Sequence, residues 1–184
     1  MRRFGVPLFL ACTLALAACV SSPEKPEQQK AFAARLEQDY IAYERVTNIE
    51  ERVQAVDRRK EFMAEWGAAP EFSGWVCNVH DVLTARLADG SANMLVLPLR
   101  CGGFGIANIL ESDGSPGAVP VGAILEGTPQ YEAAMQLNME ESVIVSGRFM
   151  IGESGRIREN SVTEYGSMRN PEFLVIYTEI QPVR

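Results

Sequence analysis

Apolar residues recur at helical spacing along residues 28–66 of this chain. They lie three and four positions apart, so each stripe would occupy one face of a helix. The first stripe consists of Phe32, Leu36, Tyr40 and Tyr43. The second stripe consists of Ile49, Val53, Val56, Met63 and Trp66. We therefore expect two helices that pack on their own domain, and packing against a partner helix is the alternative.

The boundaries of the second helix are indicated by its flanking residues. The segment Thr47-Asn48-Ile49-Glu50 fits a capping box, which predicts that the second helix begins there. The segment Gly67-Ala68-Ala69-Pro70 is expected to end it, because glycine and proline stop helices.

From residue 71 onward the pattern becomes that of β-strands. Strands are expected over residues 72–87 and 93–101, where β-branched and other apolar residues alternate with polar ones. The segment Ala88-Asp89-Gly90-Ser91 between them is a hairpin turn signal. Further strands are expected within 103–125, over 141–151 and over 173–180, and residues 152–170 are expected to form a long loop.

A short helix is expected between the third and fourth of these strands. Thr128 is suited to the N-cap and Pro129 to the first helical position, and the helix is expected to run to Leu137. The resulting order of elements is similar to that of an OB-fold, a five-stranded Greek-key barrel.

Three segments also resemble a group of uncharacterised bacterial OB-like proteins. They are Phe72-Ser73-Gly74-Trp75-Val76, Val145-Ser146-Gly147-Arg148-Phe149, and Ser161-Val162-Thr163-Glu164-Tyr165-Gly166-Ser167-Met168 with Pro171-Glu172-Phe173. The resemblance implies a fold and brings no activity. The expected fold class is α+β, mainly β: an OB-like five-stranded barrel over residues 71–184, preceded by a helical segment over 28–70.

The first residues of the chain look like a targeting signal. Arg2 and Arg3 precede an apolar run that ends in Leu16-Ala17-Ala18-Cys19, which resembles the lipobox of a bacterial lipoprotein. The resemblance implies a signal peptide over 1–18 and lipid on Cys19. The composition of the segment that follows, rich in serine, proline and glutamate, predicts a flexible tether over 19–27. Because Val20 rather than aspartate follows the cysteine, the resemblance also implies anchoring in an outer membrane, facing the periplasm.

Composition and charge narrow the classes of partner. Hydrophobic residues make up 47% of the chain, which predicts a folded core rather than disorder. The formal net charge is -7, and without residues 1–18, which include two arginines, it becomes -9. Such a surface repels phosphate backbones, so no nucleic-acid partner is expected. Anchoring to the membrane is expected to rest on the acyl chains.

Cys77 and Cys101 are the cysteines that remain once Cys12 and Cys19 are assigned to the signal and the lipid. Strand alternation places both on the core face of their strands. A hairpin centred near residue 89 pairs positions whose numbers sum to about 178 or 179, and these two sum to 178. In an oxidising compartment we expect a disulfide, and two buried thiols are the alternative.

No catalytic, metal or cofactor site is predicted. Cys77 and His80, the only histidine, would lie on opposite faces of a strand, so they are not expected to share a metal or form a catalytic pair. The glycine-rich segment 101–105 lacks the spacing of a dinucleotide-binding loop. The chain is therefore not expected to be an enzyme.

The expected loop over 152–170 is the candidate ligand site. Its candidate residues are Arg156, Arg158, Tyr165 and Arg169, because arginine forks beside an aromatic ring can bind an anionic group or a sugar. The alternative is a solvated loop whose arginines pair with Glu153, Glu159 and Glu164.

Two functions follow as hypotheses. The first is a non-enzymatic accessory or scaffold component of a cell-envelope complex, held at the membrane by lipid. Its candidate contact surfaces for a protein partner are the region of Phe72 and Trp75, the helix stripes and the long loop. The alternative is a small-ligand or glycan binding module that uses residues 152–170.

Overall fold

Five strands close into a barrel in the computed structural model, which describes residues 23–87, 89–108 and 119–183. The strands are β1 (Glu71–Val79), β4 (Leu99–Arg100), β5 (Gly105–Ala107), β7 (Ser142–Phe149) and β8 (Glu172–Pro182). Around the barrel they follow the order β1-β4-β5-β8-β7, with β5 and β8 parallel and the other neighbours antiparallel. The predicted fold class, α+β with a five-stranded barrel after a helical segment, is confirmed.

A second, three-stranded sheet interrupts the two strands that were expected to run unbroken over 72–87 and 93–101. It consists of β2 (Leu83–Arg86), β3 (Asn93–Val96) and β6 (Ile124–Leu125). The break falls at Pro98, which has no N–H, and the N–H groups of His80 and Asp81 both donate to its carbonyl. As a result Leu83, which alternation along an unbroken strand would place on the same face as Cys77, is 48% exposed. The expected hairpin turn is confirmed, since the Leu87 N–H donates to the Ala92 carbonyl at 3.0 Å.

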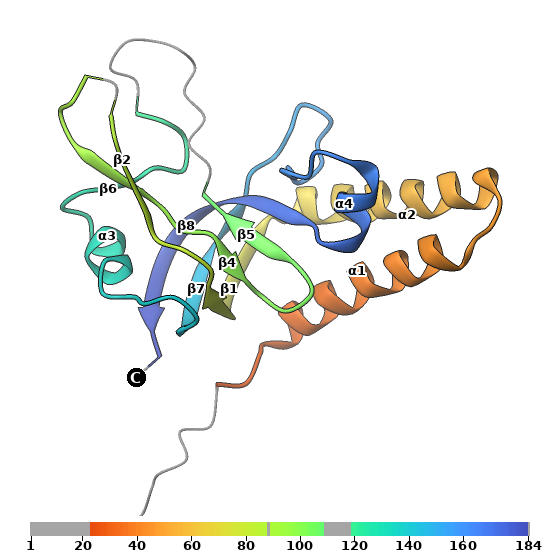
Figure 1. Cartoon of the computed structure of the whole chain (residues 1–184), viewed down its shortest axis with the longest axis horizontal. Coiled ribbons are helices and arrows are strands. Elements are labelled where there is room, and N and C mark those ends of the chain that lie inside the picture. The colour runs from red at the N-terminus through yellow and green to blue at the C-terminus, as the bar shows by residue number, and fades with distance from the viewer. Residues whose placement is uncertain (1–22, 88, 109–118, 184) are drawn as a thin grey trace, which may run out of the picture.

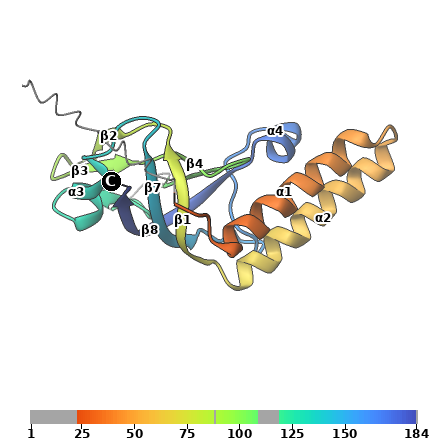
Figure 2. The same ribbon diagram turned by 90° about the horizontal axis from the view of Figure 1, so that it is seen from below.

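Two helices precede the barrel, as the apolar stripes predict. They are α1 (Glu27–Arg45) and α2 (Ile49–Ala68). The cap of α2 lies one residue later than the predicted capping box, because the Asn48 side chain, and not that of Thr47, accepts the Glu51 N–H. The two helices lie side by side as a hairpin, and its turn projects away from the barrel (Figures 1 and 2).

The α2 stripe is only half buried, contrary to the expectation that the stripe packs on its own domain. Met63 is buried, but Ile49 is 82% and Val53 is 53% exposed. The reason is that this half of α2 lies beyond the barrel and meets mainly α1 (Figure 1). The buried residues of α2 are Ala55, Arg59, Phe62 and Met63.

The base of the helical hairpin is built into the barrel core. Phe32 of α1 is fully buried, with its ring centroid 4.7–5.4 Å from those of six other aromatic residues. Phe72 and Trp75 are buried as well, so they do not form the contact surface that the sequence suggested. Gly74, with φ of 67°, lies in a register shift of β1 that places both aromatic side chains on the inner face.

Two short helices complete the structure. The first, α3 (Pro129–Ala134), begins as predicted: the Thr128 hydroxyl oxygen accepts the Tyr131 N–H at 3.2 Å. It ends at Ala134, before the predicted Leu137. The second, α4 (Glu164–Arg169), lies in the segment that was expected to be a long loop, and it packs beside α1.

Candidate functional site

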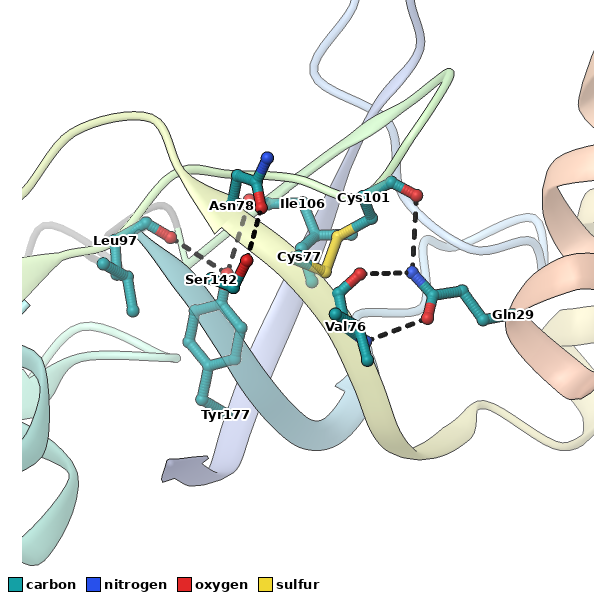
Figure 3. Close-up of a disulfide and its surroundings, with 9 residues drawn as sticks. All are labelled: Gln29, Val76, Cys77, Asn78, Leu97, Cys101, Ile106, Ser142 and Tyr177. Atoms are coloured by element: carbon teal, nitrogen blue, oxygen red, sulfur yellow. Dashed lines mark hydrogen bonds between the residues drawn. A yellow bond between two sulfur atoms is a disulfide. The ribbon is translucent and has the colours of Figure 1, made fainter. Parts of the chain in front are cut away.

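The predicted disulfide between Cys77 and Cys101 is present, with a Cα–Cα distance of 4.2 Å (Figure 3). It joins β1 to the end of β4, where Asn78 pairs with Arg100 in the antiparallel register. Gln29 connects the same place to α1. Its side-chain amide donates to the Val76 and Cys101 carbonyls at 2.7 and 3.3 Å and accepts the Val76 N–H at 2.9 Å. Covalent and hydrogen bonds therefore fix the start of α1 against the barrel.

A buried tyrosine, Tyr177, connects two backbone segments near the disulfide (Figure 3). The Tyr177 hydroxyl donates toward the Leu97 and Ile106 carbonyls, at 2.9 and 3.3 Å (Figure 3). Burial raises the pKa of Tyr177 well above its ordinary value, so the hydroxyl keeps its proton. Its role is structural, because it satisfies carbonyl groups that the interrupted strands leave inside the barrel.

The four predicted ligand residues do not form one cluster. Tyr165 and Arg169 lie together on α4: the Arg169 guanidinium donates to the Tyr165 hydroxyl at 3.1 Å and lies 5.7 Å from the ring centroid. Arg156 lines a different hollow, against α2. The Arg158 backbone pairs with Met150 and Leu174. Arg169 therefore belongs to the α1 side of α4, and Arg156 to the α2 side.

A groove of about 380 Å³ lies between α2 and residues 156–168. Its lining residues are Val56, Arg59, Lys60, Met63, Arg156, Glu159, Ser161, Val162, Thr163, Glu164, Ser167 and Met168. Two of the glutamates that the alternative pairs with the loop arginines accept hydrogen bonds from other side chains. Glu164 accepts the Tyr43 hydroxyl at 3.1 Å, and Glu159 accepts the Ser167 hydroxyl at 2.8 Å.

The carboxylate of Glu159, which lines this groove, includes a buried oxygen without a hydrogen-bond donor in the described part of the chain. Its Oε2 accepts the Ser167 hydroxyl, but its Oε1 is buried and has no hydrogen-bond partner among the described residues. A buried carboxylate oxygen without a donor costs free energy. The charged residues that line the groove are the cations Arg59, Lys60 and Arg156 and the carboxylates Glu159 and Glu164.

A buried ion pair joins three helices beneath the groove. Arg59 of α2 donates to the Asp39 carboxylate of α1 at 3.3 Å, and to the carbonyls of Leu36 at 2.7 Å and Ser167 at 3.2 Å. Burial lowers the pKa of Arg59, and the Asp39 carboxylate acts in the opposite direction. Neither residue was predicted from the sequence, although Arg59 follows Ala55 by four positions and precedes Phe62 by three, on the buried face of α2.

The described residues contain no group of three or more histidine, cysteine or acidic side chains arranged to hold a metal ion. His80 is exposed, whereas Cys77 is buried in the disulfide and has no free thiol to offer. Over the same residues, no helix is both long enough and apolar enough to span a membrane. Residues 1–22, which carry the predicted signal and lipidation site, lie outside the described residues.

Comparisons with protein-family models, with curated proteins and with solved structures gave no match.

Proposed function

We propose that this chain is a lipid-anchored, extracytoplasmic lipoprotein that acts as a non-enzymatic accessory or scaffold component of a cell-envelope complex. The resemblance of residues 16–19 to a lipobox supports the anchor. The observation that carries the scaffold function is an apolar row on α2, which we call the α2 row: Ile49 and Val53, which are exposed, and the partly buried Val56.

The α2 row has the geometry of a protein-binding face. Ile49 and Val53 are mostly exposed and stand four positions apart, so they share one face of α2. The helix α2 is one arm of the projecting hairpin (Figure 1). Val56 continues the row into the groove, where Val162 is 99% exposed. Single exposed apolar residues are common on proteins, but a row at helical spacing that continues into a groove indicates a docking surface.

Cross-linking in native membranes, followed by affinity purification and mass spectrometry, tests this function. The Ile49→Ser/Val53→Ser double variant is expected to reduce recovery of the main cross-linked protein about tenfold or more, because burying two such side chains is worth several kcal/mol. The thermal midpoint should stay nearly unchanged, since both side chains are exposed.

The matched control is Leu83→Ser/Val121→Ser. These two apolar side chains are 48% and 53% exposed, and they lie outside the helical hairpin. The control should leave recovery of the partner unchanged. Equal losses in both double variants, or no dominant protein with the unaltered chain, would count against the α2 row as the contact surface.

The second candidate function is a small-ligand or glycan binding module, and the groove between α2 and residues 156–168, lined by Lys60, Arg156 and Glu159, favours it. Calorimetric titration with N-acetylglucosamine oligomers and with inorganic sulfate provides the test. Arg156→Ala is expected to abolish binding, because Arg156 lines the groove, whereas Arg169→Ala is expected to leave binding unchanged. Absence of binding to the unaltered chain, or equal loss in both variants, would contradict a ligand site in this groove.

A further inference from the structure

A second hollow, of about 370 Å³, lies beside the disulfide and is lined by two positively charged side chains. Its lining residues are Pro23, Lys25, Val76, Cys77, Asn78, Arg100, Gly102 and Ser142. Lys25 and Arg100 are the only charged residues among them, and neither forms an ion pair with a described residue. The Lys25 ammonium lies against the exposed Gly102, 3.3 Å from the position that a Cβ would occupy. Two unpaired cations lining one hollow attract an anion.

Neutral donors lie beside these cations. Asn78 Oδ1 accepts the Ser142 hydroxyl at 3.2 Å, and the Asn78 amide nitrogen points away from that hydroxyl (Figure 3). Lysine, arginine and amide N–H groups are the usual donors to phosphate oxygens. The composition of the hollow therefore suits a phosphate group, although the formal net charge of the whole chain is -7.

The short distance along the chain between the hollow and Cys19 indicates which kind of phosphate-bearing molecule would reach the hollow. Pro23 lines the hollow and follows Cys19 by four residues, and an extended chain of that length spans at most about 14 Å. If Cys19 carries lipid, which is part of the proposed function and on which this step rests, its backbone lies at the membrane surface. The hollow is then held within reach of the phospholipid headgroups.

We propose that Lys25 and Arg100 bind the phosphate of anionic phospholipid headgroups, so that this side of the barrel lies on the membrane. The site complements the acyl chains, because it orients the domain that they only tether. From this contact, α1 runs 19 residues, or about 28 Å, to the turn of the projecting hairpin. The α2 row is thereby presented at a fixed distance along α1 from the anchored end.

The rate of lysine acetylation tests the site. The chain has three lysines, Lys25, Lys30 and Lys60, and one of them, Lys25, lines the hollow. Lipidated protein is placed in vesicles of phosphatidylcholine with and without about 30% phosphatidylglycerol, and each lysine's rate of acetylation is measured by mass spectrometry. We expect Lys25 to react about fivefold more slowly on the anionic vesicles, with recovery of the rate at about 0.5 M NaCl. Lys60, on α2, should react equally on both.

A matched pair of variants separates the site from the overall charge. Arg100→Gln is expected to remove most of the difference at Lys25, whereas Arg86→Gln, the loss of an exposed arginine on β2, should retain it. Equal Lys25 rates on the two vesicles for the unaltered chain, or equal effects of both variants, would overturn the headgroup site.

Two controls separate this inference from the anchor and from a free anion. The intact mass of the protein from native membranes shows whether Cys19 is acylated. An acylated protein with equal Lys25 rates overturns the headgroup site alone, whereas an unacylated protein overturns the anchor and this site together. Slowing of Lys25 by inorganic phosphate without vesicles, to the same extent as by anionic vesicles, would overturn the headgroup in favour of a free anion.

Discussion

Phe32→Ala is expected to lower the free energy of unfolding by about 3–5 kcal/mol, the usual cost of removing a large buried ring. Phe32 is fully buried and contacts aromatic residues from α2 and from the barrel. Its removal would leave a cavity where the helical hairpin meets the barrel, and surrounding rings close such a space only in part. Urea unfolding followed by tryptophan fluorescence measures the change, since Trp66 and Trp75 lie against Phe32.

Ile41→Ala is the matched control on the same helix. Ile41 is 37% exposed, so its loss should cost about 1 kcal/mol or less. A cost for Phe32→Ala that is no larger than this would mean that α1 is peripheral to the barrel. The expected result would mean that α1 is part of the barrel core, so that deleting residues 28–66 would uncover this core. For that reason the partner test uses point substitutions at Ile49 and Val53, which leave the core intact.

The parts of the fold that could be predicted from the sequence depend on local rules. Thr128 and Pro129 define the start of α3, because capping and proline geometry act within one turn of helix. The pairing of Cys77 with Cys101 was predicted from strand alternation and from the position of the turn, since an antiparallel register is fixed once its turn is fixed. The predicted cysteine pairing holds in spite of the break at Pro98. The numbers of two paired residues add to one less in the barrel than in the second sheet, so the register changes by only one residue across the break.

The parts that could not be predicted depend on tertiary packing. Ile49 and Met63 share one predicted stripe, but one is exposed and the other buried, since only the base of the hairpin meets the barrel. The six-residue helix α4 is too short for periodicity to show, and its position depends on contacts with α1. Arg156 and Arg169 are close in sequence, but α4 separates them into different hollows.

The buried Asp39–Arg59 pair could not be predicted for a related reason. Charged residues in helices are usually solvated, and partners 20 positions apart on two helices leave no local pattern.

Asp39→Ala is expected to cost about 3–5 kcal/mol in unfolding free energy, because it leaves the Arg59 guanidinium buried without its carboxylate. Arg35→Gln is the matched control. Arg35 donates to the same carboxylate but is 37% exposed, so its loss should cost about 1 kcal/mol or less. Equal costs would show that the buried pair is not what holds the helices.

The Asp39→Leu/Arg59→Met double variant distinguishes two roles of the pair: its contribution to the free energy of unfolding, and its effect on the position of α4 beside the groove. Replacing both charges with apolar side chains is expected to recover about half or more of the stability lost in Asp39→Ala, because no unpaired charge stays buried. Methionine cannot donate to the Ser167 carbonyl, so α4 should be held less firmly in the double variant than in the unaltered chain. The Ser167 hydroxyl, which donates to Glu159, should be less well positioned for the same reason. Hydrogen exchange of residues 164–169 should accordingly stay faster than in the unaltered chain. Normal exchange there would mean that α4 is held by Met168 and its apolar neighbours, and that Arg59 contributes to stability without positioning the groove.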